Sequence, residues 1–281
     1  MKTLLFLLFF FTAPFVSAAE NYIILASTTS TQNSGLLDHI LPMFTAKTGI
    51  NVRVVAVGTG QALRIARAGD ADAILVHHRA SEDAFVAEGF GIERLDVMYN
   101  DFVMIGPKTD PAGIKSAQKA TEALQKIAAL PATFASRGDD SGTHKKEREL
   151  WAAAGISPAG AWYLETGSGM GATLNLAADK NIYLLSDRGT WITFGNKRDL
   201  EILFSGDRVL HNPYGYIVVN PDRHAHVKAD AAQALGDWLV SAEGQKAISD
   251  FRIDGFQAFC PNAGPLAEQG ADREACPAET D

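Results

Sequence analysis

The sequence predicts an α/β protein of two domains with a ligand cleft between them. Short apolar runs alternate with segments of helical spacing, as at 22–26 and 36–44. Glycine and hydroxyl residues fill the turns between these segments. Two longer apolar segments, 97–105 and 214–220, are candidates for strands that cross from one domain to the other and back. Because ligands bind beyond the carboxyl ends of strands in open α/β sheets, two such sheets would face each other across one cleft.

The crossover segments predict the domain boundaries. Domain I comprises residues 19–106 plus 213–281, and domain II comprises residues 107–212. Residues 1–18 have the features of a secretory signal peptide, namely an early lysine, an apolar run and a small-residue cleavage site. The sequence therefore predicts a periplasmic protein with a cleaved signal peptide.

The charge balance of the sequence limits the kinds of molecule that the protein is expected to bind. The net charge is −8, and 21% of the residues are charged. This balance argues against nucleic acid and against acidic membrane surfaces, but it leaves a small anion possible, since a local cluster of N–H groups is enough to bind one. The two cysteines, Cys260 and Cys276, lie near the end of the chain, and in an exported protein they predict one disulfide.

The segment Ser136–His144, SRGDDSGTH, is the strongest candidate for a site. It joins an apolar run to a segment of helical character, and a helix start offers unpaired N–H groups and the positive end of the helix dipole. Arg137 adds a planar cation, Ser141 and Thr143 add hydroxyls, and Gly142 allows a ligand to approach the backbone. Together these groups predict a cradle for an oxyanion.

Two alternatives remain open for the same segment. Ser141 can be an ordinary helix cap, and Arg137 can simply pair with Asp139 or Asp140. The two carboxylates can also supply an acceptor for a protonated anion such as phosphate, or they can orient Arg137. We favour orientation, because the other candidate turns contain hydroxyls and N–H groups and no acceptor of this kind.

Three other strand-to-helix turns are rich in donors. The first is the hydroxyl cluster 27–31, STTST, and the second is Gly58-Thr59-Gly60. The third is the glycine-rich turn 166–171, in which Gly169 is a candidate. Neither G-x-G-x-x-G nor G-x-x-x-x-G-K-[ST] occurs in the chain, so nucleotide binding is unsupported.

A pair of histidines, His77-His78, follows a short apolar run at 73–76. Neighbours in an extended segment point to opposite faces, and no metal-ligand motif accompanies the pair. We therefore expect the two histidines to line a cleft or cap the strand, and we predict neither a metal nor a cofactor.

Seven segments spread over the mature chain form a combined signature: STTSTQNSGLLDHILPMF, VGTGQAL, GDADAILVHHR, NDFVMIGP, SRGDDSGTHKKE, WYLETGSGM and LSDRGTW. With these segments, the sequence resembles the TupA family of extracytoplasmic tungstate-binding proteins of ABC transporters over nearly all of the mature chain. SRGDDSGT is also similar to phosphate-binding relatives, and the family's T-T-T-S motif has Ser27 at its first position here.

The resemblance implies a periplasmic-binding-protein (type II) fold that closes around tungstate, with molybdate as a near-equivalent, and then docks on a membrane permease. It also implies a protein that is not an enzyme, and we expect a monomer. Ligand roles carried over by resemblance fall on Ser27, Thr28, Thr59, Arg137, Ser141 and Thr143, with the backbone of Gly60, Gly142 and Gly169.

The same residues leave two other functions open. One is a binding protein for phosphate or another tetrahedral oxyanion. The other is an exported hydrolase using Ser141 and His144, which helical spacing can bring together. The second lacks both a G-x-S-x-G motif around Ser141 and an identified carboxylate to orient the histidine.

Overall fold

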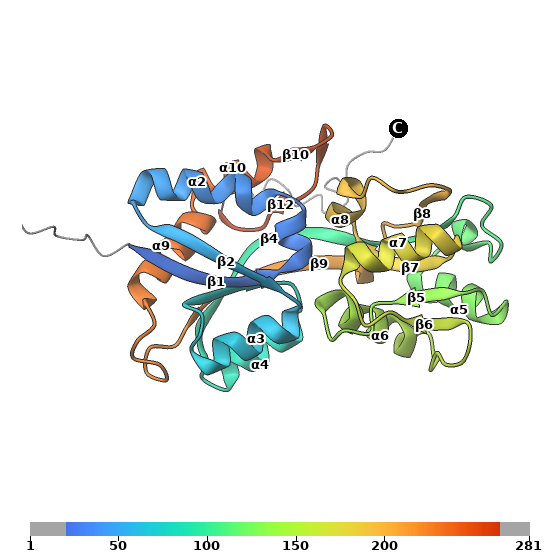
Figure 1. Ribbon diagram of the computed structural model, residues 1–281, viewed down its shortest axis with the longest axis horizontal. Coiled ribbons are helices and arrows are strands. Elements are labelled where there is room, and N and C mark those ends of the chain that lie inside the picture. Colours follow the sequence, from blue (N-terminus) through green and yellow to red (C-terminus); the bar gives the residue numbers. More distant parts are fainter. Residues whose placement is uncertain (1–20, 265–281) are drawn as a thin grey trace, which may run out of the picture.

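The computed structural model describes residues 21–264 and has two lobes on one mixed sheet (Figure 1). The ten strands of this sheet run in the order β2-β1-β3-β9-β4-β7-β5-β6, with β8 and β12 also paired to β4. A separate two-stranded ribbon is formed by β10 (Arg252–Ile253) and β11 (Phe256–Gln257).

The first lobe is built on three parallel strands followed by helices. Its strands are β1 (Tyr22–Thr28), β2 (Asn51–Val57) and β3 (Ala73–Val76). Parallel strands place their carboxyl ends at one edge of the sheet, and each helix that follows starts at that edge. The helices of this lobe are α1 (Thr29–Asn33), α2 (Leu36–Thr48), α3 (Thr59–Ala68), α4 (Arg79–Ala87), α9 (Ala229–Val240) and α10 (Ala242–Asp250).

Two strands connect the lobes. β4 (Gly91–Pro107) pairs with β9 (His211–Val219) as far as Asp101, and from Phe102 onward it pairs with strands of the second lobe. The predicted crossover segments therefore lie in β4 and β9. The domain boundaries at 106/107 and 212/213 stay predictions.

The second lobe is also built on three parallel strands, β5, β6 and β7. Strand β8 pairs antiparallel with β4. Helix α6 of this lobe begins directly after the turn that follows β5. The elements are β5 (Phe134–Ser136), β6 (Tyr163–Glu165), β7 (Tyr183–Asp187), β8 (Leu200–Phe204), α5 (Ala120–Ala129), α6 (Gly142–Ala153), α7 (Met170–Lys180) and α8 (Arg188–Thr193), with short 3-10 turns at Ile114–Ser116 and Arg208–Leu210.

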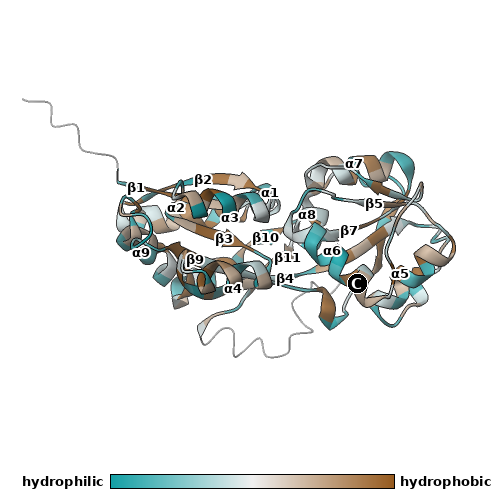
Figure 2. Cartoon of the chain, turned by 90° about the horizontal axis from the view of Figure 1, so that it is seen from below, coloured by the Kyte–Doolittle hydropathy of each residue, from teal (hydrophilic) through white to brown (hydrophobic). Residues whose placement is uncertain are grey.

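Hydrophobic cores lie on both faces of the sheet in each lobe. In the first lobe, α2, α9 and α10 pack on one face and α3 and α4 on the other, since alternate residues of a strand point to opposite sides. In the second lobe, α5 and α6 cover one face and α7 and α8 the other. Figure 2 shows mainly hydrophobic strands between helices of mixed character. Both lobes thus hold their strand ends on rigid, doubly covered sheets.

The structure corrects one prediction from the sequence and leaves two others untested. The segment 27–31, expected as a turn between a strand and a helix, instead completes β1 and forms most of α1. The predicted signal peptide and Cys276 lie outside the described residues, so cleavage and the disulfide stay predictions; Cys260 itself is buried in β12 (Cys260–Pro261). None of the helices within 21–264 is long and apolar enough to cross a bilayer.

Candidate functional site

Strand ends and helix starts from both lobes meet at one small cavity. From the first lobe come the residues after β1, β2 and β3, and from the second lobe come those after β5. The volume of the cavity is about 10 Å³, a size for one small species, whereas pockets for organic ligands are typically ~300 Å³ or more. The lining residues are Thr28, Thr29, Ser30, Val57, Gly58, Thr59, His77, Arg137, Ser141, Gly142 and Thr143.

The first-lobe contribution begins with the hydroxyls around α1. Thr28 is the N-cap of this helix, and its Oγ1 accepts from the backbone N–H of Thr31 at 3.3 Å. The same Oγ1 lies 3.0 Å from Oγ of Ser30 and 2.6 Å from Oγ1 of Thr31. The three hydroxyls form a continuous buried chain, and two of its members line the cavity.

Thr59 opens α3 without a hydrogen-bond partner for its side chain. The residue is fully buried, and its Oγ1 is among the buried polar atoms that have no partner among the described residues. A buried hydroxyl left unpaired is costly, typically about 1 to 3 kcal/mol. Since this oxygen borders the cavity, a ligand there would remove the cost.

Arg137 supplies the cation, and its position is set from two sides. Its Nε donates to the carbonyl oxygen of Ser168 at 2.8 Å, and its Nη2 donates to Asp139 Oδ2 at 2.5 Å. Asp139 in turn accepts from the backbone N–H of Ser141 at 3.2 Å. The arginine is 3% exposed, so its charge acts in a medium where electrostatic interactions are strong. Asp139 therefore orients the guanidinium.

The start of α6 forms the opposite wall of the cavity. Ser141 is the N-cap, and its Oγ accepts from the backbone N–H of His144 at 3.2 Å. Gly142 follows, where a methyl group would lie 2.9 Å from Cε1 of His77 and 3.0 Å from Oγ1 of Thr59. This glycine lets the two lobes come together, and the first-turn N–H groups of α6 have no partner inside the helix.

His77 is a lining residue that the sequence placed in a cleft without giving it a ligand role. Its ring stacks on Tyr214, with centroids 4.8 Å apart, and its Nδ1 lies 3.0 Å from Oδ1 of Asn212. Burial lowers the pKa of His77 to about 4, and the charges of Arg137 and His78 act in the same direction, against the opposing effect of Asp187. The ring is therefore neutral at neutral pH.

Three predicted ligand residues lie outside the cavity lining. Ser27 donates its hydroxyl to the carbonyl oxygen of Leu75 on the neighbouring strand, at 2.8 Å. Gly60 faces Asp140, whose carboxylate occupies the space that a Cβ would fill. Gly169 is the N-cap of α7, beside the Ser168 carbonyl that holds Arg137. The glycine-rich turn thus acts on the cavity through Arg137. The other six predicted residues line the cavity together.

No Asp or Glu of residues 21–264 lines the cavity. Asp140, the other carboxylate of the SRGDDSGTH segment, lies 3.5 Å from Arg64 of the first lobe. Two more contacts join the lobes beside it: His78 Nε2 to Glu149 Oε1 at 3.0 Å, and Lys145 Nζ to Ser81 Oγ at 3.1 Å. The lobes are therefore closed on each other around a space lined by donors, a neutral imidazole and one cation.

Glu147 fastens α6 to the strands beneath it. Its Oε1 accepts from the hydroxyl of Tyr163 at 2.6 Å and from Nε1 of Trp151 at 3.2 Å. Burial raises the pKa of this carboxyl to about 7, against the effect of the hydrogen bonds that it accepts.

The raised pKa of Glu147 gives a testable dependence of stability on pH. The folded protein binds this proton more tightly than the unfolded chain does, so the Glu147 contribution to the free energy of unfolding decreases as pH rises from about 4.5 to about 7. The slope is at most about 1.4 kcal/mol for each pH unit. Urea unfolding of Glu147→Gln across this range should show a flatter profile than the unaltered protein, and an equal slope in both would contradict the assignment.

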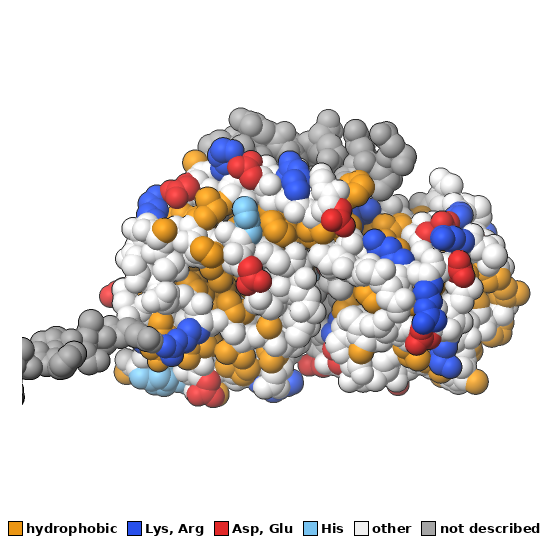
Figure 3. Space-filling view, turned by 45° about the horizontal axis from the view of Figure 1, so that its top comes forward, with side chains coloured by type: hydrophobic (Ala, Val, Ile, Leu, Met, Phe, Trp, Pro, Cys, Tyr) orange, Lys and Arg blue, Asp and Glu red, His pale blue; other side chains and the backbone are white. Residues whose placement is uncertain are grey.

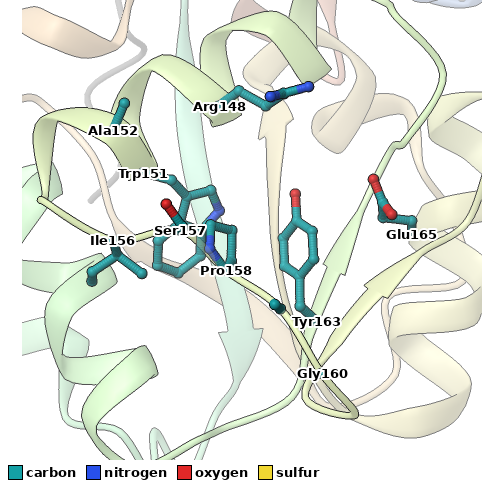
Figure 4. A pocket seen from close by; sticks show the side chains of 10 residues that line it. Arg148, Trp151, Ala152, Ile156, Ser157, Pro158, Gly160, Tyr163 and Glu165 are labelled. Carbon is teal, nitrogen blue, oxygen red and sulfur yellow. The ribbon is translucent and has the colours of Figure 1, made fainter.

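A larger hollow of about 490 Å³ lies away from this cavity, beside α6 in the second lobe (Figure 4). Trp151, Ile156 and Pro158 contribute apolar surface, and Arg148 and Glu165 stand at its sides. The hollow and the small cavity share no lining residue, although α6 contributes residues to both. Strand ends and helix starts do not converge there.

The surface and the remaining titratable groups narrow the chemistry further. On the face shown in Figure 3, acidic and basic side chains are interspersed. Within residues 21–264 no group of three or more His, Cys, Asp or Glu is arranged to hold a metal ion. The ring of His144 does not act on Ser141: its Nδ1 accepts from the backbone N–H of Asp140 at 3.1 Å, and Oγ of Ser141 is used as the helix cap.

Comparisons with known proteins agree with this geometry. Residues 16–243 match the PBP superfamily domain. Tungstate-binding protein TupA of Peptoclostridium acidaminophilum is 47% identical over 249 residues, covering 87% of each chain. The solved structure of the tungstate ABC transporter from Geobacter sulfurreducens is 54% identical, covers 83% of this chain and 100% of its own, and has a TM-score of 0.77. TupA from Desulfovibrio alaskensis G20 is 47% identical, covers 86% and 99%, and has a TM-score of 0.75.

The fold, together with the closure of its two lobes on a small polar cavity, defines a solute-binding protein of the PBP superfamily. Within that superfamily the chain belongs to the TupA family. The fold class and the family expected from the sequence are thereby confirmed.

Proposed function

We propose that this protein binds tungstate in the cavity between its lobes and delivers it to the permease of an ABC importer. The observation that carries the proposal is a lining that combines the start of two longer helices, several hydroxyls and a buried arginine, with no carboxylate among the described residues. Tungstate, molybdate and sulfate carry no proton at neutral pH and need donors alone. The names of the relatives favour tungstate among these ions.

The proposal extends to the setting in which the protein works. Its signal peptide would direct it to the periplasm, where it would act as a monomer, without a cofactor and without catalysing a reaction. Phosphate binding is the alternative that the absence of a lining carboxylate disfavours, because phosphate keeps a proton at neutral pH and is best matched by a site with a carboxylate acceptor.

A thermal-shift panel on the signal-free protein tests the ligand. Tungstate, molybdate, sulfate and phosphate would each be added at the same concentration, on the order of tens of micromolar, because a ligand that binds the folded state alone raises Tm. A large shift with tungstate and little with sulfate or phosphate is expected. A shift with phosphate alone would move the assignment to the alternative, and no shift with any ion would overturn oxyanion binding.

Replacing Thr59 by valine should change affinity and stability in opposite directions. Valine keeps the shape of the side chain but removes the hydroxyl that has no partner, so the ligand-free protein should be as stable as before or slightly more so. A hydrogen bond to a charged ligand would be lost, which costs about 1.5 to 3 kcal/mol, or roughly 10- to 150-fold in Kd. Calorimetric titration together with Tm of the free protein measures both, and an unchanged Kd would remove Thr59 from the site.

A further inference from the structure

His77 connects the hydroxyl chain of α1 to an amide of β9. On one side, Oγ of Ser30 lies 3.4 Å from Nε2 of His77. On the other side, Oδ1 of Asn212 lies 3.0 Å from Nδ1. Both the imidazole and Ser30 line the cavity. His77 is 5% exposed and Ser30 is 4% exposed, so bulk water does not provide these atoms with alternative partners.

The hydrogen of the neutral ring is assigned to one nitrogen from the contact with Asn212, with the amide oriented as in the structure. The side-chain N–H group of Asn212 donates to Oδ1 of Asn100 at 2.7 Å, which places the amide oxygen toward His77. An amide oxygen accepts hydrogen bonds and cannot donate one. The hydrogen of the neutral ring is therefore on Nδ1, and Nε2 presents a lone pair to Ser30.

A lone pair at Nε2 sets the direction of the whole hydroxyl chain. Ser30 donates its one hydrogen to Nε2, Thr28 donates to Ser30 over 3.0 Å, and Thr31 donates to Thr28 over 2.6 Å. In this arrangement the hydroxyls of Ser30 and Thr28 turn oxygen lone pairs, and no hydrogen, toward the cavity. That is the wrong polarity for an anion.

We propose that His77 takes up one proton from solvent at Nε2 when the oxyanion binds. This inference rests on the proposed function, since it requires an anion in the cavity. The protonated ring donates to Ser30 instead of accepting from it, which releases the hydrogens of Ser30 and Thr28 to donate to the ligand. The imidazolium also adds a positive charge beside Arg137. His77 is thus a residue that couples anion affinity to protonation.

The charged and titratable groups around His77 explain why the anion is needed for this step. Without a ligand, burial together with the positive charges of Arg137 and His78 opposes protonation, and only Asp187 and the hydrogen bond to Asn212 favour it. An anion in contact reverses the balance, because a nearby opposite charge moves a pKa by roughly 1 to 3 units. The other groups packed against the ring are Tyr214, Phe102 and Gly142.

Calorimetric titration with sodium tungstate at pH 5.5, in two buffers of different ionisation enthalpy, measures the proton. We expect the apparent enthalpies to differ by an amount that corresponds to the uptake of most of one proton for each ion bound, because a pKa of about 4 raised by roughly 2 to 3 units leaves the ring largely protonated at this pH. Because binding and protonation are linked, affinity should fall as pH rises, at most tenfold for each unit. Binding without proton uptake would overturn the role of His77 alone, whereas absence of any binding would overturn the proposed function.

Two variants assign the proton to a residue. His77→Gln cannot ionise, and it should bind tungstate roughly tenfold more weakly, with no proton uptake. His78→Gln is the matched control for proton uptake, because His78 is adjacent but lies outside the cavity lining. It removes the contact with Glu149 across the lobes, so its affinity should fall while its proton uptake is kept. Uptake lost in His78→Gln and kept in His77→Gln would overturn the proposal. Long-range ¹H–¹⁵N NMR of the unaltered protein follows Nε2 directly, whether or not the variants fold.

Discussion

Arg137→Met is expected to weaken tungstate binding by at least about 30-fold. Methionine keeps most of the length of the side chain but removes the buried cation beside the cavity, and it leaves Asp139 without its charged partner. Truncating one partner of a buried, hydrogen-bonded charge pair costs about 2 to 5 kcal/mol. The loss should appear in Kd by calorimetry, and Tm of the ligand-free protein should fall as well because the carboxylate of Asp139 stays largely buried.

Two further substitutions show whether the effect belongs to the site. Arg148→Met removes an exposed arginine of α6 that lines the larger hollow and not the cavity. Its Kd for tungstate should stay within about twofold of that of the unaltered protein. Arg137→Lys keeps the charge but not the planar fork that reaches the carbonyl of Ser168 and the carboxylate of Asp139 together. Its affinity should lie between those of the unaltered protein and Arg137→Met. A Kd for Arg137→Met equal to that of the unaltered protein would exclude the guanidinium from binding.

Much of the fold could be predicted from the sequence because each strand-to-helix junction carries its own local signal. An apolar run, then glycine or hydroxyl residues, then helical spacing marks the junctions at Thr28, Thr59 and Ser141. Parallel strands bring such junctions to one edge, so a shared site followed from topology without knowledge of any contact. Local pattern was sufficient where local structure decides the position of the side chain.

The rest depends on contacts between distant residues. His77 is held by Asn212, which is 135 positions away in the chain, and nothing near His77 in the sequence indicates this partner. Ser27 and Thr28 are neighbours of similar chemistry, yet Ser27 bonds to the adjacent strand and Thr28 borders the cavity. Which of the two faces the cavity depends on the register of β1 against β3, and the pattern STTST leaves that open.

The glycine-rich turn illustrates an indirect role that spacing alone does not reveal. The sequence predicts Gly169 as a ligand residue, whereas in the structure the carbonyl oxygen of the preceding Ser168 holds Arg137. A turn that presents carbonyl oxygens would repel an anion, but it is well suited to orient a cation. The turn and Arg137 are separated by 31 residues, so their contact is a property of the folded second lobe.

Gly142→Ala is expected to weaken tungstate binding without destabilising the ligand-free protein. Gly142 is the first residue of α6, where alanine favours the helix over glycine by up to about 1 kcal/mol. The stability of the free protein should therefore stay equal or rise. The methyl group that this substitution adds would lie 2.9 Å from Cε1 of His77 and 3.0 Å from Oγ1 of Thr59. Both of these residues belong to the opposite lobe. Closure of the lobes, and not their folding, would be obstructed.

Overpacking of this kind costs about 1 to 3 kcal/mol, so Kd for tungstate should rise roughly 5- to 150-fold. Gly171→Ala is the matched control, because it also lies in the first turn of a helix, α7, and a methyl group there meets no atom within 4 Å. Small-angle scattering with and without tungstate would show whether Gly142→Ala still closes. Normal affinity in this variant would mean that the lobes of the ligand-bound protein lie farther apart at Gly142 than in this structure, around a cavity of more than about 10 Å³.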